Sequence, residues 1–129
     1  MRRWRSESGA AAVEFALVVP VLVSLVFGII DFSSVYSSQA TLSAAARQGA
    51  RVMALQNSSA AAVTAVLAAA PTLNPALTSA QVTVSPAACT PGANATVTIT
   101  YPLKSVSGFF TQLFKSKNLT GKAVMRCSG

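Results

Sequence analysis

Few side chains in this chain could perform acid–base, nucleophilic or metal chemistry. Among 129 residues the only carboxylates are Glu7, Glu14 and Asp31, and histidine is absent. General acid–base catalysis and metal sites draw mainly on these residue types. Serine and threonine are plentiful, but outside the amino-terminal segment no acid or histidine is present to activate a hydroxyl. The sequence therefore predicts a protein that is not an enzyme, with no catalytic residue, no metal site and no cofactor.

Glu14 is the acid whose position needs an explanation. It lies in residues 9–15 (GAAAVEF), which open an apolar run that continues to Ile30. A carboxylate in hydrocarbon costs about 2.5 kcal/mol or more, so such an acid marks a functional site by default. A plain membrane anchor does not need it. A subunit that packs helix against helix can use it, because the acid can pair with a neighbour's free amino terminus.

The apolar run is long enough to cross a membrane. Charged residues make up only 10% of the chain and the mean hydropathy is +0.53, whereas about a quarter of the residues of soluble domains are charged. Residues 10–30 would form roughly 30 Å of helix, which matches the hydrocarbon core of a bilayer. Pro20 should kink this helix or open its hydrogen bonds locally, and neighbouring helices can compensate for that defect. Asp31 follows the run and marks its outer edge.

Charge asymmetry orients the predicted span. Arg2, Arg3 and Arg5 precede the apolar run, and no basic residue follows it until Arg47. The positive-inside rule therefore predicts a single-pass protein of the cytoplasmic (inner) membrane, with its amino terminus inside and residues 32–129 outside.

The two cysteines, Cys89 and Cys127, do not have the spacing of a metal or redox motif. Because the outer region is expected to face an oxidising compartment, we expect a disulfide between them. It would join a hairpin loop to the last strand.

Periodicity predicts an α+β arrangement, in which a long amino-terminal helix packs on a small antiparallel β-sheet. The helical pattern continues past the membrane, so residues 10–55 should form one helix with a bare inner half. Residues 57–59 (NSS) break it before a second helix over residues 60–70. From Gln81 onward, apolar residues alternate with threonine and serine, which is typical of half-buried strands.

Three strands are expected in this region. Their predicted ranges are 82–85, 96–101 and 119–127, with a hairpin turn at 90–94. Between the last two strands, residues 107–114 read as a short helix or aromatic turn. We expect its Phe109, Phe110 and Phe114 to belong to the core.

Three amino-terminal motifs, taken in order, resemble one known family. They are residues 9–20 (GAAAVEFALVVP), 28–32 (GIIDF) and 43–51 (SAAARQGAR). This set resembles the TadE-like family of minor pilin-like (pseudopilin) proteins of the tight-adherence, or Flp-type, pilus system. Family members often carry an arginine shortly after the membrane end, and residues 31–34 (DFSS) lack it.

The resemblance implies processing by a prepilin peptidase between Gly9 and Ala10, which leaves Glu14 near the mature amino terminus as the assembly acid. Pro20 and Asp31 are assigned to the same assembly helix. The family also implies a structural role with other pilin or pilin-like subunits in a surface filament (type IVc-like) that serves adhesion or secretion.

The expected domain organisation follows from these assignments. It comprises a leader at 1–9, a transmembrane assembly helix at 10–31, an extracytoplasmic helical region at 32–70 and a sheet domain at 81–129.

The outer region is basic and has no internal counter-charge. Residues 32–129 contain no Asp or Glu. Their positive field must be solvated or matched by an anionic partner, such as envelope polymer, lipid headgroups or an acidic subunit, and we expect no specific nucleic acid. The candidate basic contact surface consists of Lys115, Lys117, Lys122 and Arg126.

Two alternative interpretations stay open. The arginine-rich start, the apolar centre and the small residues 38–40 also fit a secretory signal cleaved after Ala40. An uncleaved anchor is the other. The corresponding function would be an anchored or secreted envelope-binding module whose basic outer domain holds anionic polymer.

Overall fold

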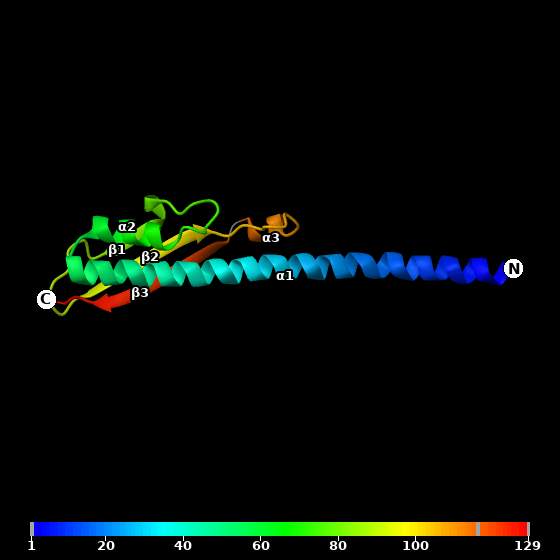
Figure 1. Ribbon diagram of the computed structural model, residues 1–129, viewed down its shortest axis with the longest axis horizontal. Helices are drawn as coiled ribbons and strands as arrows, with labels where there is room; N and C mark the ends of the chain where they lie inside the picture. Colours follow the sequence, from blue (N-terminus) through cyan, green and yellow to red (C-terminus); the bar gives the residue numbers. More distant parts are fainter. Residues whose placement is uncertain (1, 116, 129) are drawn as a thin grey trace.

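One long helix organises the chain. The computed structural model describes residues 2–115 and 117–128. Helix α1 spans Arg2–Gln56 and projects from one end of the folded domain (Figure 1). Its outer half lies on the sheet beside α2 (Ser59–Ala69), and its inner half extends beyond the sheet (Figure 1). The helix predicted over residues 10–55 is confirmed, and it is longer at both ends.

Helix α1 passes through Pro20 without interruption. Over the described length of α1, Figure 1 shows no sharp bend, so the expected kink is not seen. Pro20 has no N–H to donate to the preceding turn. On its other side the Ser24 hydroxyl donates a hydrogen bond to the Pro20 carbonyl oxygen at 2.7 Å. The effect of the proline is therefore confined to its own part of the helix.

The sheet has three antiparallel strands in the order β1-β2-β3. Strand β2 (Asn94–Pro102) pairs with β1 (Val82–Ser85) on one edge and with β3 (Asn118–Arg126) on the other. A short 3₁₀ helix, η1 (Ser79–Gln81), precedes β1. These elements confirm the α+β class and the antiparallel sheet.

The core lies between the two helices and one face of the sheet. Its fully buried members include Leu42, Ala46 and Ala50 of α1, Val66 of α2, and Val97 and Ile99 of β2. Successive strand residues point to opposite faces, so the threonines of β2 lie on the other face of the sheet. Alanine-rich surfaces on α1 and α2 let these helices approach the sheet closely.

Tyr101 ties the segment before η1 to the sheet. Its side chain is buried at the end of β2, and its hydroxyl donates a hydrogen bond to the Pro75 carbonyl oxygen at 2.6 Å. Burial raises the pKa of the Tyr101 hydroxyl above its usual value. A tyrosine hydroxyl is already protonated at neutral pH, and the raised pKa keeps this one able to donate to a higher pH than an exposed tyrosine.

The aromatic segment does not join this core, contrary to the prediction. Helix α3 (Thr111–Phe114) lies beyond the end of the sheet and alongside α1 (Figure 1). Phe109 is 53% exposed, and Phe110 and Phe114 are only half-buried. The α1 and α2 side chains already cover the sheet's inner face, so the β2–β3 connection packs on α1 instead.

Cys89 and Cys127 form a disulfide, as expected. Their Cα atoms lie 5.8 Å apart, and the bond joins the β1–β2 loop to the residue after β3. Asn57 ends α1 with a φ of 50°, and its side-chain oxygen accepts a hydrogen bond from the Cys89 N–H. The end of the long helix, the loop and the end of the sheet are therefore held at one place.

Replacing Cys89 and Cys127 together by serine should lower the free energy of unfolding of the outer domain by about 3–4 kcal/mol. This is the chain-entropy value for a loop of this size. Urea unfolding of the purified chain in detergent, followed by tyrosine fluorescence, measures the change. Reduced wild-type protein is the control and should unfold with the double variant. Equal midpoints for oxidised wild type and the double variant would contradict this account.

Strand β3 contacts the backbone of α1 at Gly121. A Cβ at this position would lie 2.8 Å from the carbonyl oxygen of Leu42 and 2.9 Å from its Cβ. Leu42 is itself fully buried, so it has no free space into which to move. The close approach of strand and helix therefore requires glycine.

Gly121→Ala should destabilise the domain by about 1–3 kcal/mol, the usual cost of overpacking a core. The same urea experiment reports it. The matched control is Lys122→Ala at the adjacent exposed position, which should change stability by less than about 0.5 kcal/mol. If both variants unfold alike, the contact with Leu42 does not constrain the strand.

Candidate functional site

The predicted processing and assembly residues lie on the bare part of α1. Gly9, Ala10, Glu14 and Pro20 are all exposed on this helix. Ala10 and Glu14 are four residues apart, so they lie on the same helical face, about one turn from each other. Cleavage between Gly9 and Ala10, and a role of Glu14 in assembly, stay predictions.

The same part of α1 presents an extensive apolar surface. The helix is long and apolar enough to cross a membrane, and its most apolar stretch is not buried by the rest of the chain. The exposed apolar side chains in this stretch include Val13, Phe15, Leu17, Val21, Leu22, Leu25, Val26, Ile29 and Ile30. An exposed patch of this extent marks a membrane or protein contact. The helix therefore indicates a single-pass membrane anchor.

Asp31 ends this stretch, and its side chain is buried. It is 1% exposed, and no other charged side chain among the described residues is buried. Its Oδ2 accepts hydrogen bonds from the hydroxyls of Ser105, at 2.6 Å, and Ser107, at 2.9 Å. Its Oδ1 accepts one from the Ser107 N–H at 2.9 Å. The carboxylate is thus satisfied by hydrogen bonds within the chain, in addition to marking the edge of the predicted span.

The two serines extend this connection into the loop before α3. The Ser105 hydroxyl oxygen accepts a hydrogen bond from the Gly108 N–H at 3.1 Å, and the Ser107 hydroxyl oxygen accepts one from the Phe109 N–H at 3.2 Å. Gly108 has a φ of 76°, a conformation that favours glycine. The carboxylate of α1 therefore organises the turn that leads into the aromatic segment.

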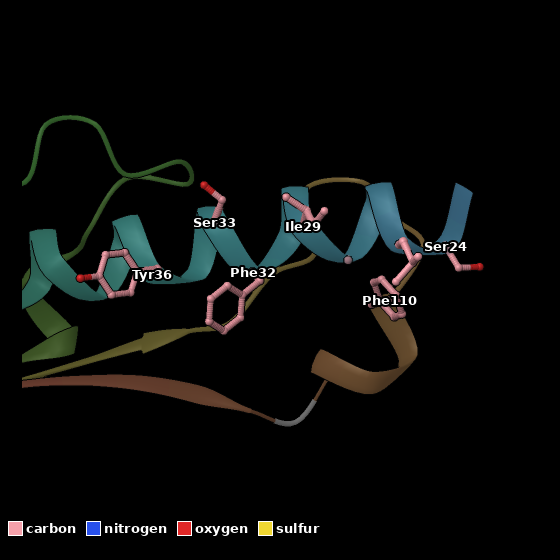
Figure 2. A pocket seen from close by; sticks show the side chains of 8 residues that line it. Ser24, Ile29, Phe32, Ser33, Tyr36 and Phe110 are labelled. Carbon is pink, nitrogen blue, oxygen red and sulfur yellow. The ribbon is translucent and has the colours of Figure 1, made fainter. Parts of the chain in front are cut away.

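Aromatic rings continue the contact along α1. The ring of Phe109 lies 5.3 Å from that of Phe27 on α1 and 4.9 Å from that of Phe110, measured between centroids. Phe110 lies 6.3 Å from Phe114 by the same measure. Figure 2 shows Phe110 beside α1, on the side from which Phe32 also projects. The β2–β3 connection is thus joined to α1 by hydrogen bonds at Asp31 and by ring contacts at Phe27.

Shallow apolar grooves flank Phe110. One is lined by Ser24, Leu25, Gly28, Ile29, Phe32, Ser33, Tyr36 and Phe110 (Figure 2). Ligand sites for polar molecules place a few polar groups so that they converge on the ligand. Here the walls are apolar apart from serine and tyrosine hydroxyls, so the groove fits hydrocarbon or an apolar side chain.

The structure does not gather the four candidate basic residues into one surface. Lys115 and Lys117 are exposed between α3 and β3. Lys122 and Arg126 are exposed on β3, and Arg126 pairs with Asn94 at the far end of the sheet. Strand geometry spreads residues 117–126 over roughly 30 Å. Lys115 and Lys117 are therefore near the aromatic segment, whereas Arg126 is not.

Sequence reasoning missed the serine partners of Asp31. Residues 105–108 (SVSG) carry only the local signal of a turn. The carboxylate that they bind lies 74 residues before Ser105. No periodic pattern links positions so far apart, although an isolated acid at the end of an apolar run was a sign that a partner must exist.

Asp31→Ala should release the β2–β3 connection from α1. The two hydroxyls and the N–H would lose a charged acceptor, and hydrogen bonds of this kind contribute about 1.5–3 kcal/mol. Amide hydrogen exchange at Ser107 and Phe109 should therefore accelerate on the order of 10- to 100-fold. The core amide of Ile99 serves as an internal control and should be unaffected. Unchanged exchange at Ser107 would show that the carboxylate does not hold the loop.

The comparison with known proteins bears on the helix that carries these sites. Residues 9–51 match the family model described as TadE-like protein. No curated protein and no solved structure matches the chain. The match covers most of the bare half of α1 and much of the half that packs on the sheet. The predicted resemblance is thereby confirmed: residues 9–51 are similar to the TadE-like family.

Proposed function

We propose that this chain is a minor pilin-like structural subunit of a tight-adherence pilus, and that a prepilin peptidase removes residues 1–9. The observation that carries the proposal is the bare apolar half of α1 with Glu14 at its start, inside the segment that matches the family. An apolar helix of this kind can lie in the cytoplasmic membrane and later pack against other subunits. In this scheme the amino terminus is cytoplasmic and the sheet domain is outside.

Cleavage would create a cationic partner for Glu14. A new α-amino group at Ala10 would lie on the same helical face as Glu14, one turn away. In hydrocarbon an unpaired carboxylate is costly, so it favours any arrangement that brings a cation to it. The amino group of a neighbouring subunit is such a cation. Pairing between subunits would then favour assembly and set the axial offset between adjacent helices.

The alternative function, an envelope-binding module, would use the basic residues of the outer domain. These residues are spread from the segment before β3 to the far end of that strand: Lys115, Lys117, Lys122 and Arg126. A single basic patch would support the envelope-binding function better. The two functions differ in the residues on which they depend. The subunit depends on Glu14, and the binding module depends on the cations.

Glu14→Ala should block incorporation into filaments while leaving cleavage intact. Breaking a buried ion pair by removing one partner costs about 3–5 kcal/mol, so incorporation should fall by roughly two to four orders of magnitude. Intact mass of the protein from host membranes reports cleavage, and its amount in sheared filaments reports incorporation. Glu7→Gln, which removes an exposed acid from the leader, is the matched control and should behave as wild type.

Two results would overturn the proposal. One is normal incorporation of Glu14→Ala. The other is a mature mass that begins at Thr41 or includes Met1, since either would mean that the prepilin site is not used. Loss of function only in a Lys122→Gln/Arg126→Gln variant would favour the envelope-binding module.

A further inference from the structure

The β2–β3 connection ends in an exposed apolar tip. Val106, Phe109 and Leu113 form this tip, and their exposed fractions are 65%, 53% and 65%. The tip lies beyond the end of the sheet, alongside α1 on the side of its amino terminus (Figure 1). The hydrogen bonds of Asp31 and the Phe27–Phe109 ring contact hold it there.

We propose that the apolar tip inserts into the outer leaflet of the membrane that α1 spans. The inference rests on the membrane-anchored state in the proposed function and adds a second, shallow membrane contact to it. Before the subunit enters a filament, lipid would then touch the chain at two places. The sheet domain would consequently have one defined height and orientation on the membrane surface.

The position of the tip along α1 supports its insertion into the outer leaflet. Phe109 contacts Phe27, which precedes Asp31 by about one helical turn, or roughly 6 Å along the helix. Residues 10–31 are the predicted span, so a side chain at the level of Phe27 is already below the membrane edge. Apolar faces of interfacial segments reach about 5–10 Å into the boundary between headgroups and acyl chains. Aromatic residues are also enriched at this level.

The charges around the tip fit lipid headgroups. Lys104 precedes the tip and Lys115 follows it, and both side chains are exposed. Lysine side chains extend along an apolar surface and keep their ammonium group at the interface, where anionic headgroups attract it. A second copy of this chain docking tip to tip would bring like charges together, since its tip has the same two lysines. The charge pattern therefore favours an anionic bilayer over self-association.

Asp31 attaches the segment before the tip to α1. Its carboxylate accepts three hydrogen bonds from Ser105 and Ser107, just before the tip. Leu25, Ile29 and Phe32 of α1 line an apolar groove together with Phe110, which belongs to the same connection as the tip. The connection that carries the tip and the adjacent turns of α1 therefore form one apolar surface, and Asp31 is a positioning residue for that surface.

Single-tryptophan variants of the full chain test the depth directly. The lone tryptophan, Trp4, is first replaced by phenylalanine. Tryptophan is then introduced at Leu113 in the tip, at Leu22 in the predicted span, or at Val124 on the far part of β3. These three positions are 65%, 54% and 53% exposed, so the substitution should be tolerated at each. Each protein is reconstituted in two sets of phosphatidylcholine–phosphatidylglycerol vesicles, one with lipid brominated at shallow acyl positions and one with lipid brominated at deep acyl positions.

We expect Leu113→Trp to lose about half of its emission to shallow bromines, because the tip lies at interfacial depth. Leu22→Trp should be quenched by deeper bromines, and Val124→Trp by neither. If Leu22→Trp is quenched and Leu113→Trp is not, the tip is outside the membrane and this inference is wrong, while the anchored state stands. If neither is quenched, the anchored state itself is wrong. Blue-shifted but unquenched Leu113→Trp emission that depends on protein density would show a second copy covering the tip.

A separate measurement tests the contact of Lys104 and Lys115 with anionic headgroups. Quenching of Leu113→Trp should increase when phosphatidylglycerol is added to phosphatidylcholine, and Lys104→Gln/Lys115→Gln should abolish that increase. Lys122→Gln/Arg126→Gln removes the same charge from β3, and Arg126 lies at the far end of the sheet. This control pair should leave the increase intact. If both pairs behave alike, the headgroup contact at the tip is wrong.

Discussion

The buried carboxylate of Asp31 is the constraint on which the arrangement of this protein depends. A carboxylate removed from water needs hydrogen-bond donors or a cation, and the outer domain supplies two serine hydroxyls and one N–H. Those donors belong to the β2–β3 connection, so satisfying the charge also fixes the aromatic segment against the helix. The single charged group of the apolar–polar boundary therefore determines where the folded domain ends and the bare helix begins.

The two halves of helix α1 have different surroundings. Its outer half is packed through alanines and Leu42, whose backbone approaches Gly121 of β3 closely enough to exclude a side chain. Its inner half carries large apolar side chains that the rest of the chain does not cover. Small residues bring backbones close within the domain, while large ones present a wide surface to lipid or to neighbouring subunits. The change from one composition to the other occurs around Asp31.

Residues 32–129 contain no Asp or Glu, and the structure shows where their basic side chains lie. Lys104 and Lys115 flank the apolar tip, whereas Lys122 and Arg126 lie on β3, an edge strand of the sheet. Charged side chains on an edge strand discourage pairing with other chains. The cations thus divide into a group near the expected membrane surface and a group along β3, and no single ligand is needed for both.

Local signals in the sequence, namely periodicity, turn residues and the cysteine count, were enough to predict the long helix, the break at residues 57–59, the three strands and the disulfide. Motifs confined to residues 9–51 also predicted the resemblance to the TadE-like family, whose model matches those residues. The location of the aromatic segment and the partners of Asp31 depend on how the helices and the sheet pack together. The phenylalanines have the composition of a core, but the inner face of the sheet was already filled by α1 and α2. The partners of Asp31 are 74 and 76 residues away in the chain, and contacts at that separation depend on how the sheet packs on the helix.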